Sequence, residues 1–225
     1  MLVVSITHGR RGSSTCGELG LYRLLASDSM GFHDIPMLRG TRMTLEPLSL
    51  DHADELAAAV AEGELWRRWY TRIPSPAQMR ADIAHRIAQH EAGQIVPWTV
   101  RRAGDGRAVG MTTYLNIVEE HRRLEIGSTW LALSAQRTGI NTEAKLHLLT
   151  HAFETLGCIA VEFRTHWHNQ QSRRAIAALG ARQDGVLRSH QLGPEGTLRD
   201  TVVFSIIAGE WPAVRLSLAE KLVGR

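Results

Sequence analysis

The chain is poor in cysteine and has no long hydrophobic run, and both features limit the classes of protein to which it can belong. Two cysteines, Cys16 and Cys158, occur among 225 residues. They are too few for a disulfide framework and too isolated for a cysteine-based metal site, so we expect a reducing, cytoplasmic setting. No segment approaches the roughly 20 apolar residues that span a bilayer, and no signal-peptide pattern opens the chain. We therefore expect no membrane partner.

A large excess of positive or negative charge is also missing. The chain has 26 basic and 23 acidic residues, a net charge of +3, and no run of five like charges. A nucleic-acid-binding module would rest on this slight excess alone, without interleaved aromatic and basic residues, so we expect no nucleic-acid partner. Hydrophobic residues at 44% and charged residues at 22% are typical of a globular chain. The length suits one generous domain.

The first 36 residues differ from the rest because they show no sustained period of two or 3.6 residues. We expect residues 1–36 to be an N-terminal extension and residues 37–225 to form the domain. Met30 and Met37 are both plausible starts. The alternative is an arm that completes a dimer or covers a site.

Hydrophobic periodicity predicts a mixed α/β domain with helices on the faces of a sheet. Strands are predicted over residues 42–47, 94–102, 108–117, 124–133, 158–167, 185–192 and 198–207, and helices over residues 52–61, 64–70, 77–92, 141–156 and 169–179.

Residues 134–142 form the loop with the clearest chemistry, since they join a predicted strand to the most regular predicted helix. Gly139 allows backbone N–H groups to converge, and the helix that follows adds partial positive charge. Such a loop can hold an anion such as a pyrophosphate. The alternative is an ordinary turn in which Asn141 or Thr142 caps the helix.

Four short motifs in this order resemble the GNAT superfamily of N-acetyltransferases. The sequence QRTGIN at 136–141 is similar to the family's Q/R-x-x-G-x-G/A motif, and NQQS at 169–172 with LGA at 179–181 to its N-x-x-S and L-G-F. The segments EIGSTWL at 125–131 and RDTVVFS at 199–205 resemble patterns of the subgroup that acetylates the N-termini of ribosomal proteins. The resemblance spans residues 38–208.

The resemblance implies a mostly antiparallel sheet with one parallel strand pair, and direct acetyl transfer from acetyl-CoA to an amine without a metal. The amine would belong to a small molecule or a peptide, and homodimers are frequent in the subgroup. A backbone N–H near Leu131 would polarise the thioester carbonyl. The residues implied in acetyl-CoA binding are Leu131, Leu133, Gln136, Arg137, Thr138, Gly139, Ile140, Asn141, Thr142, Asn169 and Ser172.

The sequence departs from the family pattern at several positions. Asn141 stands where Gly or Ala is usual, and Ile176 where many members have a general-acid tyrosine. The stretch RSHQ at 188–191 lacks the carboxylate that the subgroup uses. These departures motivate an alternative, a catalytically quiet module that binds or senses acyl-CoA.

Acetyl transfer to an amine also requires proton transfer, and three residues are candidates for this role. Glu125 is the first candidate base, and His190 is the second, since the ordinary histidine side chain can exchange a proton near neutral pH. The alternative for Glu125 is a structural acid paired with Arg122, Arg123 or Arg164. Ser172 would protonate the leaving thiolate; its alternatives are cofactor hydrogen bonding and helix capping.

Two side-chain groups complete the candidates. Trp66, Trp69 and Tyr70 would cover an apolar or peptide-like acceptor, with core packing as the alternative. The histidine pairs 147/151 and 166/168 lack the third and fourth ligands that zinc needs, so we expect no metal. Cys158 fits core packing.

Overall fold

The computed structural model describes residues 30–193 and 196–223, so residues 1–29 of the predicted extension lie outside the described part. The end of the extension packs on the domain. Phe32 and Ile35 contact the hydrophobic core, and Trp98 donates a hydrogen bond from Nε1 to the carbonyl oxygen of Pro36 at 2.8 Å.

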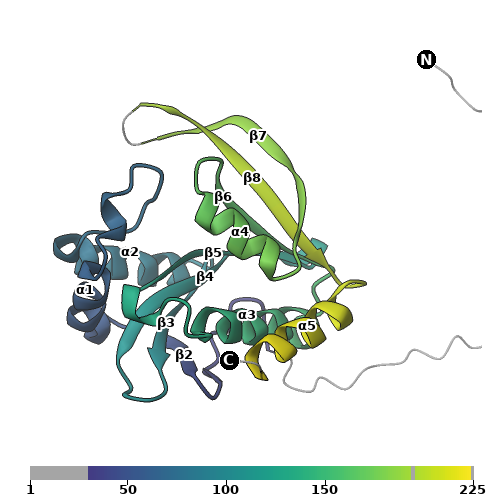
Figure 1. The fold of residues 1–225 in the computed structure, drawn as a ribbon, viewed down its shortest axis with the longest axis horizontal. Coiled ribbons are helices and arrows are strands. Elements are labelled where there is room, and N and C mark those ends of the chain that lie inside the picture. The colour runs from purple at the N-terminus through teal and green to yellow at the C-terminus, as the bar shows by residue number, and fades with distance from the viewer. Residues whose placement is uncertain (1–29, 194–195, 224–225) are drawn as a thin grey trace, which may run out of the picture.

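One mixed sheet organises the described residues, with its eight strands in the order β1-β2-β3-β4-β5-β6-β8-β7 (Figure 1). The strands are β1 (Leu38–Arg39), β2 (Met43–Pro47), β3 (Val96–Arg102), β4 (Ala108–Val118), β5 (Arg123–Leu131), β6 (Ala160–His166), β7 (Arg182–Leu192) and β8 (Leu198–Ile207). The α-helices are α1 (Ala53–Ala61), α2 (Met79–Glu91), α3 (Ile140–Thr150), α4 (Gln170–Ala178) and α5 (Trp211–Val223).

The strand pair β5–β6 is parallel, and the other neighbouring pairs of the described sheet are antiparallel. Its register is Arg123↔Ala160, Leu124↔Val161 and Glu125↔Glu162, and among the described residues no pair follows. The carboxyl-terminal parts of the two strands therefore separate. This arrangement confirms the predicted fold class.

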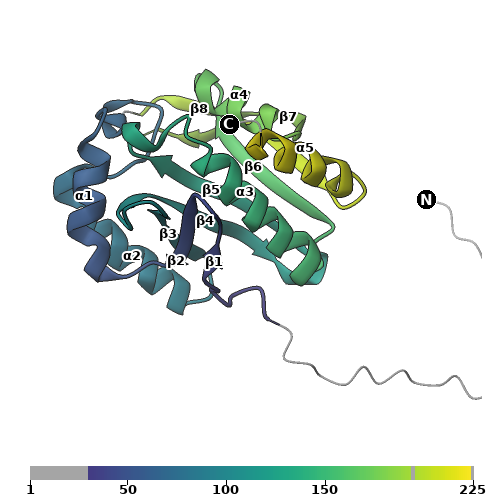
Figure 2. The same cartoon turned by 60° about the horizontal axis from the view of Figure 1, so that its bottom comes forward.

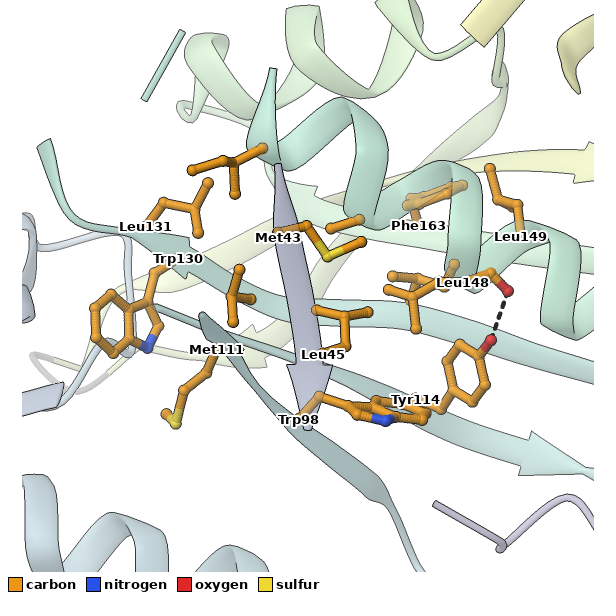
Figure 3. Packing of buried hydrophobic residues seen from close by; sticks show 14 of the residues in the cluster. Met43, Leu45, Trp98, Met111, Tyr114, Trp130, Leu131, Leu148, Leu149 and Phe163 are labelled. Atoms are coloured by element: carbon orange, nitrogen blue, oxygen red, sulfur yellow. Dashed lines mark hydrogen bonds between the residues drawn. The ribbon is translucent and has the colours of Figure 1, made fainter. Parts of the chain in front are cut away.

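The helices α3 and α5 lie side by side over the sheet, and α1 packs against α2 at the other end of the molecule (Figure 2). The core gathers Trp98, Tyr114 and Phe163 from the strands with Leu148 and Leu149 from α3 (Figure 3). Tyr114 donates its hydroxyl to the carbonyl oxygen of Leu148 at 2.6 Å. This bond satisfies a polar group in the apolar layer.

Local signals explain most element boundaries. Ser49 accepts a hydrogen bond from the N–H of Asp51 and begins a 3-10 turn that leads into α1, as expected for a capping serine. Ser75 has the same role before α2, together with Pro76 in the first turn. The predicted helix over residues 141–156 begins one residue earlier, and its last turn is a π-helix over His151–Thr155.

Three elements differ from the sequence prediction, and the first is the two-residue strand β1, which no predicted strand covers. Residues 64–70 form a 3-10 turn at Leu65–Arg67 and otherwise irregular chain, because Glu64 has a positive φ of 47° that ends regular helix geometry. The helix α5 was not predicted. Pro212 in its first turn and the buried spacing of Trp211, Val214 and Leu218 are the signals that indicate it.

We predict that Leu148→Ala lowers the free energy of unfolding by about 2–5 kcal/mol, because Leu148 is fully buried and its removal leaves a cavity. The matched control is Leu216→Ala in α5, since Leu216 is 73% exposed and its loss should cost less than about 0.5 kcal/mol. Urea unfolding measures both. Equal losses would contradict the assigned core.

Candidate functional site

The loop between β5 and α3 forms a backbone cradle. Arg137 and Gly139 both have left-handed conformations, with φ values of 63° and 91°, and Gly139 is the N-cap of α3 without a side-chain cap. The first helical bond of α3 runs from the N–H of Glu143 to the carbonyl oxygen of Gly139. The N–H groups at the start of α3 therefore point out of the helix end, where an anion can accept from them. Gly139, rather than Asn141 or Thr142, is the cap.

A buried carboxylate that sequence reasoning missed holds this helix end. Glu143 accepts hydrogen bonds from the N–H and hydroxyl of Thr41 at 3.0 and 2.7 Å, and from the N–H groups of Arg42 and Met43 at 2.8 and 3.1 Å. Burial raises the pKa of Glu143, but the bonds from Thr41 and Arg42 outweigh it, so its pKa is lowered. A Cβ at Gly40 would lie 2.5 Å from the Glu143 carboxyl carbon. The turn before β2 is thus fastened to the first turn of α3.

Beyond the pair Glu125↔Glu162, the edge of β5 on the side of β6 is not paired with that strand among the described residues. We call this the open edge of β5. The β4–β5 register shifts between Met111 and Thr113, opposite Ser128, which has a φ of 46°. Ala132 donates its N–H to Val109, and bonded and non-bonded pairs alternate along an antiparallel ladder. Leu131 therefore turns its N–H and C=O away from β4, and its carbonyl accepts the Gln136 amide at 3.0 Å.

The other cofactor candidates lie around this edge. Asn169 caps α4 with its side-chain oxygen, which accepts from the N–H of Ser172 at 3.0 Å. Ser172 is half-buried in the first turn of α4. The side-chain amides of Gln171 and Gln136 lie 3.5 Å apart and connect α4 to the cradle. Leu133, Thr138, Ile140, Asn141 and Thr142 belong to the same loop and helix start, and Leu133 is exposed.

Glu125 stands at the last pair of the parallel β5–β6 section and is 6% exposed. Its Oε2 accepts a hydrogen bond from Asn116 at 2.7 Å and lies 3.5 Å from Nε of Arg164. Burial raises the pKa of Glu125, and the bond from Asn116 and the charge of Arg164 oppose this only in part. Glu162 takes the shorter ion pairs, at 2.6 Å to Arg123 and 2.8 Å to Arg164.

The structure separates the three aromatic candidates. Trp69 is 46% exposed and meets His166 edge-on, with ring centroids 5.0 Å apart, while the Tyr70 ring is 5.7 Å from that of Trp69. His168 also approaches Trp69, at 5.5 Å. Trp66 packs against the hydrophobic core instead, so the core alternative describes its position.

The second base candidate lies on the outermost strand. His190 is exposed on β7, and its Nδ1 is 3.1 Å from the Thr201 hydroxyl. On the neighbouring strand β8, the carboxylate of Asp200 accepts hydrogen bonds from the N–H of Ser189 and the guanidinium of Arg188, at 2.7 and 2.9 Å.

A buried lysine beside the β5 bulge also escaped sequence reasoning. Lys145 of α3 is 4% exposed, and its Nζ donates to the hydroxyls of Thr112 and Thr129 at 2.9 and 2.7 Å. These hydroxyls lie 2.8 Å from each other. Burial lowers the pKa of Lys145 to about 7. The sequence does not indicate that this lysine is buried, because it is the sheet packed against α3 that excludes water from its side chain.

Residues 30–193 and 196–223 contain neither a metal-ligand cluster nor a membrane-spanning helix. Within them, no three His, Cys, Asp or Glu side chains are grouped so that they could hold a metal ion. None of the helices described is both long and apolar enough to cross a membrane. Cys158 is buried, and burial raises the pKa of its thiol to about 12, which fits packing rather than nucleophilic chemistry.

Comparison with known proteins gives a consistent result. A family model described as an acetyltransferase (GNAT) domain matches residues 42–182. A search of curated proteins finds no match. A GCN5-related N-acetyltransferase from Brucella melitensis is 28% identical, with a TM-score of 0.76, and the match covers 83% of this chain and 85% of that one.

Two further solved structures are similar. A protein from T. thermophilus, provisionally assigned as an acetyltransferase, is 32% identical with a TM-score of 0.74 over 84% of this chain and 98% of that one. RimJ from Mycobacterium smegmatis, solved in complex with CoA-disulfide, is 23% identical with a TM-score of 0.67 over 80% and 88% of the two chains. At that identity the likeness shows the fold.

We predict that Gly139→Val lowers the affinity for CoA at least tenfold, about 1.4 kcal/mol. A side chain here is strained by the φ of 91° and enters the cradle beside Arg42, whose Cδ would be 3.1 Å from the new Cβ. Isothermal titration measures the affinity. Gly157→Val is the control, since its φ is 64° with nothing within 4 Å of a Cβ. Unchanged affinity in a folded Gly139 variant would refute the cradle.

We also predict that Lys145→Met stabilises the fold most below pH 7 and progressively less toward pH 10.5. The folded pKa of about 7 lies below the ordinary 10.5, so the unfolded chain binds more protons between these values and the stability of the native protein rises with pH there. Urea unfolding at several pH values measures the difference. Lys221→Met, at an exposed position, is the control. Parallel pH curves for the native protein and Lys145→Met would contradict the burial of an ionisable amine.

Proposed function

The chain belongs to the GNAT acetyltransferase family, and we propose that it transfers an acetyl group from acetyl-CoA to a primary amine by direct attack in a ternary complex. The observation that carries this proposal is the backbone cradle at the start of α3, next to the edge where β5 and β6 separate. A cradle of N–H groups suits a pyrophosphate. The amine would belong to a small molecule or a protein N-terminus.

The residues around the cradle fit an acyl-CoA. Backbone N–H groups from Arg137 to Thr142 would hold the pyrophosphate, with the Arg137 side chain adding charge. The amide of Asn169 would reach the pantetheine arm, since its capping bond uses the side-chain oxygen. Acetyl-CoA supplies the thioester whose carbonyl carbon the amine attacks.

The chain's own groups then handle charge and protons. The N–H of Leu131, turned to the open edge of β5, would stabilise negative charge on the carbonyl oxygen. Glu125 accepts the proton that the attacking amine loses, and its raised pKa makes it a stronger base than an ordinary glutamate. Ser172 would donate a proton to the departing thiolate and regain one, through water, from the protonated Glu125, so both residues return to their starting states. The products are an amide and the free thiol of CoA.

Glu125 is better placed for this role than His190. It is buried beside the separated strands, whereas His190 is exposed on the outermost strand and faces Thr201. The ion pair of Glu125 with Arg164 at 3.5 Å is longer than the 2.8 Å pair of Glu162 with the same arginine, so Glu125 is held less tightly by that charge.

We predict that Glu125→Gln lowers kcat by about 10²–10⁴-fold, the usual contribution of a general base, with little change in acetyl-CoA affinity. In the native enzyme the rate should fall as the pH drops through the raised pKa of Glu125, since the base must be deprotonated. This step should be absent in the variant. Release of the CoA thiol measures turnover with a panel of primary amines.

Glu120→Gln is the control, because the side chain of Glu120 is 78% exposed. Acetyl-CoA at about 100 times its Kd should raise the stability by about 2.7 kcal/mol, and ATP should not. No stabilisation by acetyl-CoA or CoA would overturn the proposal. Stabilisation without turnover on any amine would instead favour the quiet acyl-CoA-binding module. A homodimer and a cytoplasmic location stay predictions.

A further inference from the structure

A small hollow lies between the chain segment that joins α1 to α2 and the strands β6 and β8. It is lined by Trp69, Tyr70 and Arg72 from the segment, His166 from β6 and Arg199 from β8, with neighbouring Thr71, Gly193 and Thr197. In Figure 1 the joining segment rises toward the end of β7 and the start of β8. Arg72 bridges the two with a hydrogen bond from Nη2 to the carbonyl oxygen of Leu192 at 3.2 Å. We call this the acceptor hollow.

Strand register places the acceptor hollow on the same sheet face as Glu125. Glu162, Arg164 and His166 alternate along β6 and so point to one face, and Arg164 reaches Glu125 on that face at 3.5 Å. His166 pairs with Thr201 of β8, and Arg199 stands two residues before Thr201, so its side chain points to the same face.

Arg199 carries hydrogen-bonding capacity that the described residues do not use. Its side chain is half-buried, and its Nε is buried without a hydrogen-bond partner among them. Burial lowers the pKa of Arg199, and the charge of Arg72 lowers it further, while Glu125 opposes this. An unsatisfied buried donor destabilises the fold, and a charged donor does so more strongly, unless a ligand pairs with it. Two guanidinium groups thus converge on one small space.

The chemistry of this arrangement selects an acceptor class. Guanidinium groups match carboxylates in geometry and charge, and the rings of Trp69, Tyr70 and His166 line the same space. Resting on the proposed acetyl transfer, we propose that the acceptor is an amine that also carries a carboxylate, as a free amino acid does, with the carboxylate bound by Arg199 and Arg72 and the amine directed to Glu125.

The test compares each of the 20 amino acids with its carboxamide as acceptor for the full-length enzyme with acetyl-CoA. At least one amino acid should be acetylated with a kcat/KM at least tenfold above that of its amide. Arg199→Gln should bring this ratio close to one, mainly through KM. Arg199→Lys, which keeps the charge but loses the planar fork, should restore part of the preference.

Arg188→Gln is the matched control on the same hairpin, since the Arg188 side chain is 81% exposed and pairs with Asp200. Thermal unfolding of each variant checks its fold. Three results would overturn this inference and leave the acetyl transfer standing. They are equal or faster turnover of the carboxamides, turnover only of peptides or of amines without a carboxylate, and a ratio of kcat/KM values that Arg199→Gln leaves unchanged. Failure of acetyl-CoA to stabilise the protein would overturn the acetyl transfer itself.

Discussion

The short parallel pairing of β5 with β6 is the constraint on which the rest of the site depends. Three residue pairs join these strands, whereas β5 stays paired with β4 past a register shift near Ser128 as far as Leu131. A sheet that stayed paired would use every N–H and C=O along this edge. Because the strands separate instead, Leu131 turns its N–H to the open edge while its carbonyl oxygen accepts the Gln136 amide, and Glu125 stands at the point where the opening begins.

The cradle needs a second constraint, since a helix end with unsatisfied N–H groups must be held in place without covering them. Glu143 meets this need from inside α3. Its hydrogen bonds to residues 41–43 fix the helix end to the turn before β2, while the left-handed Arg137 and Gly139 leave the outer side open. The side chain that orders the cradle is therefore one whose carboxylate is occupied by donors of the chain itself.

The two faces of the opening differ in chemistry. The α3 side holds the buried Lys145, whose two threonine partners satisfy it without a charge to oppose it. The other face carries Glu125, Arg164, His166 and Arg199 beneath Trp69. In the proposed reaction, cofactor and acceptor would approach one edge from opposite sides, which is the geometry that direct transfer between them requires.

The amino-acid sequence was enough to predict the fold class, most strands and helices, and a glycine-containing loop before α3, because hydrophobic periodicity, capping serines and a glycine between strand and helix are local signals. Through a resemblance it also indicated Glu125 and the Trp69–Tyr70 pair. Three other features became visible in the folded chain alone: Trp66 packs against the core, Glu143 fastens the cradle, and Lys145 is buried. The position of Arg199 beside Arg72 and His166 likewise depends on the folded chain. These four roles depend on contacts between residues distant in the chain, and no local pattern encodes which strand face, or which neighbour, a charged side chain will meet.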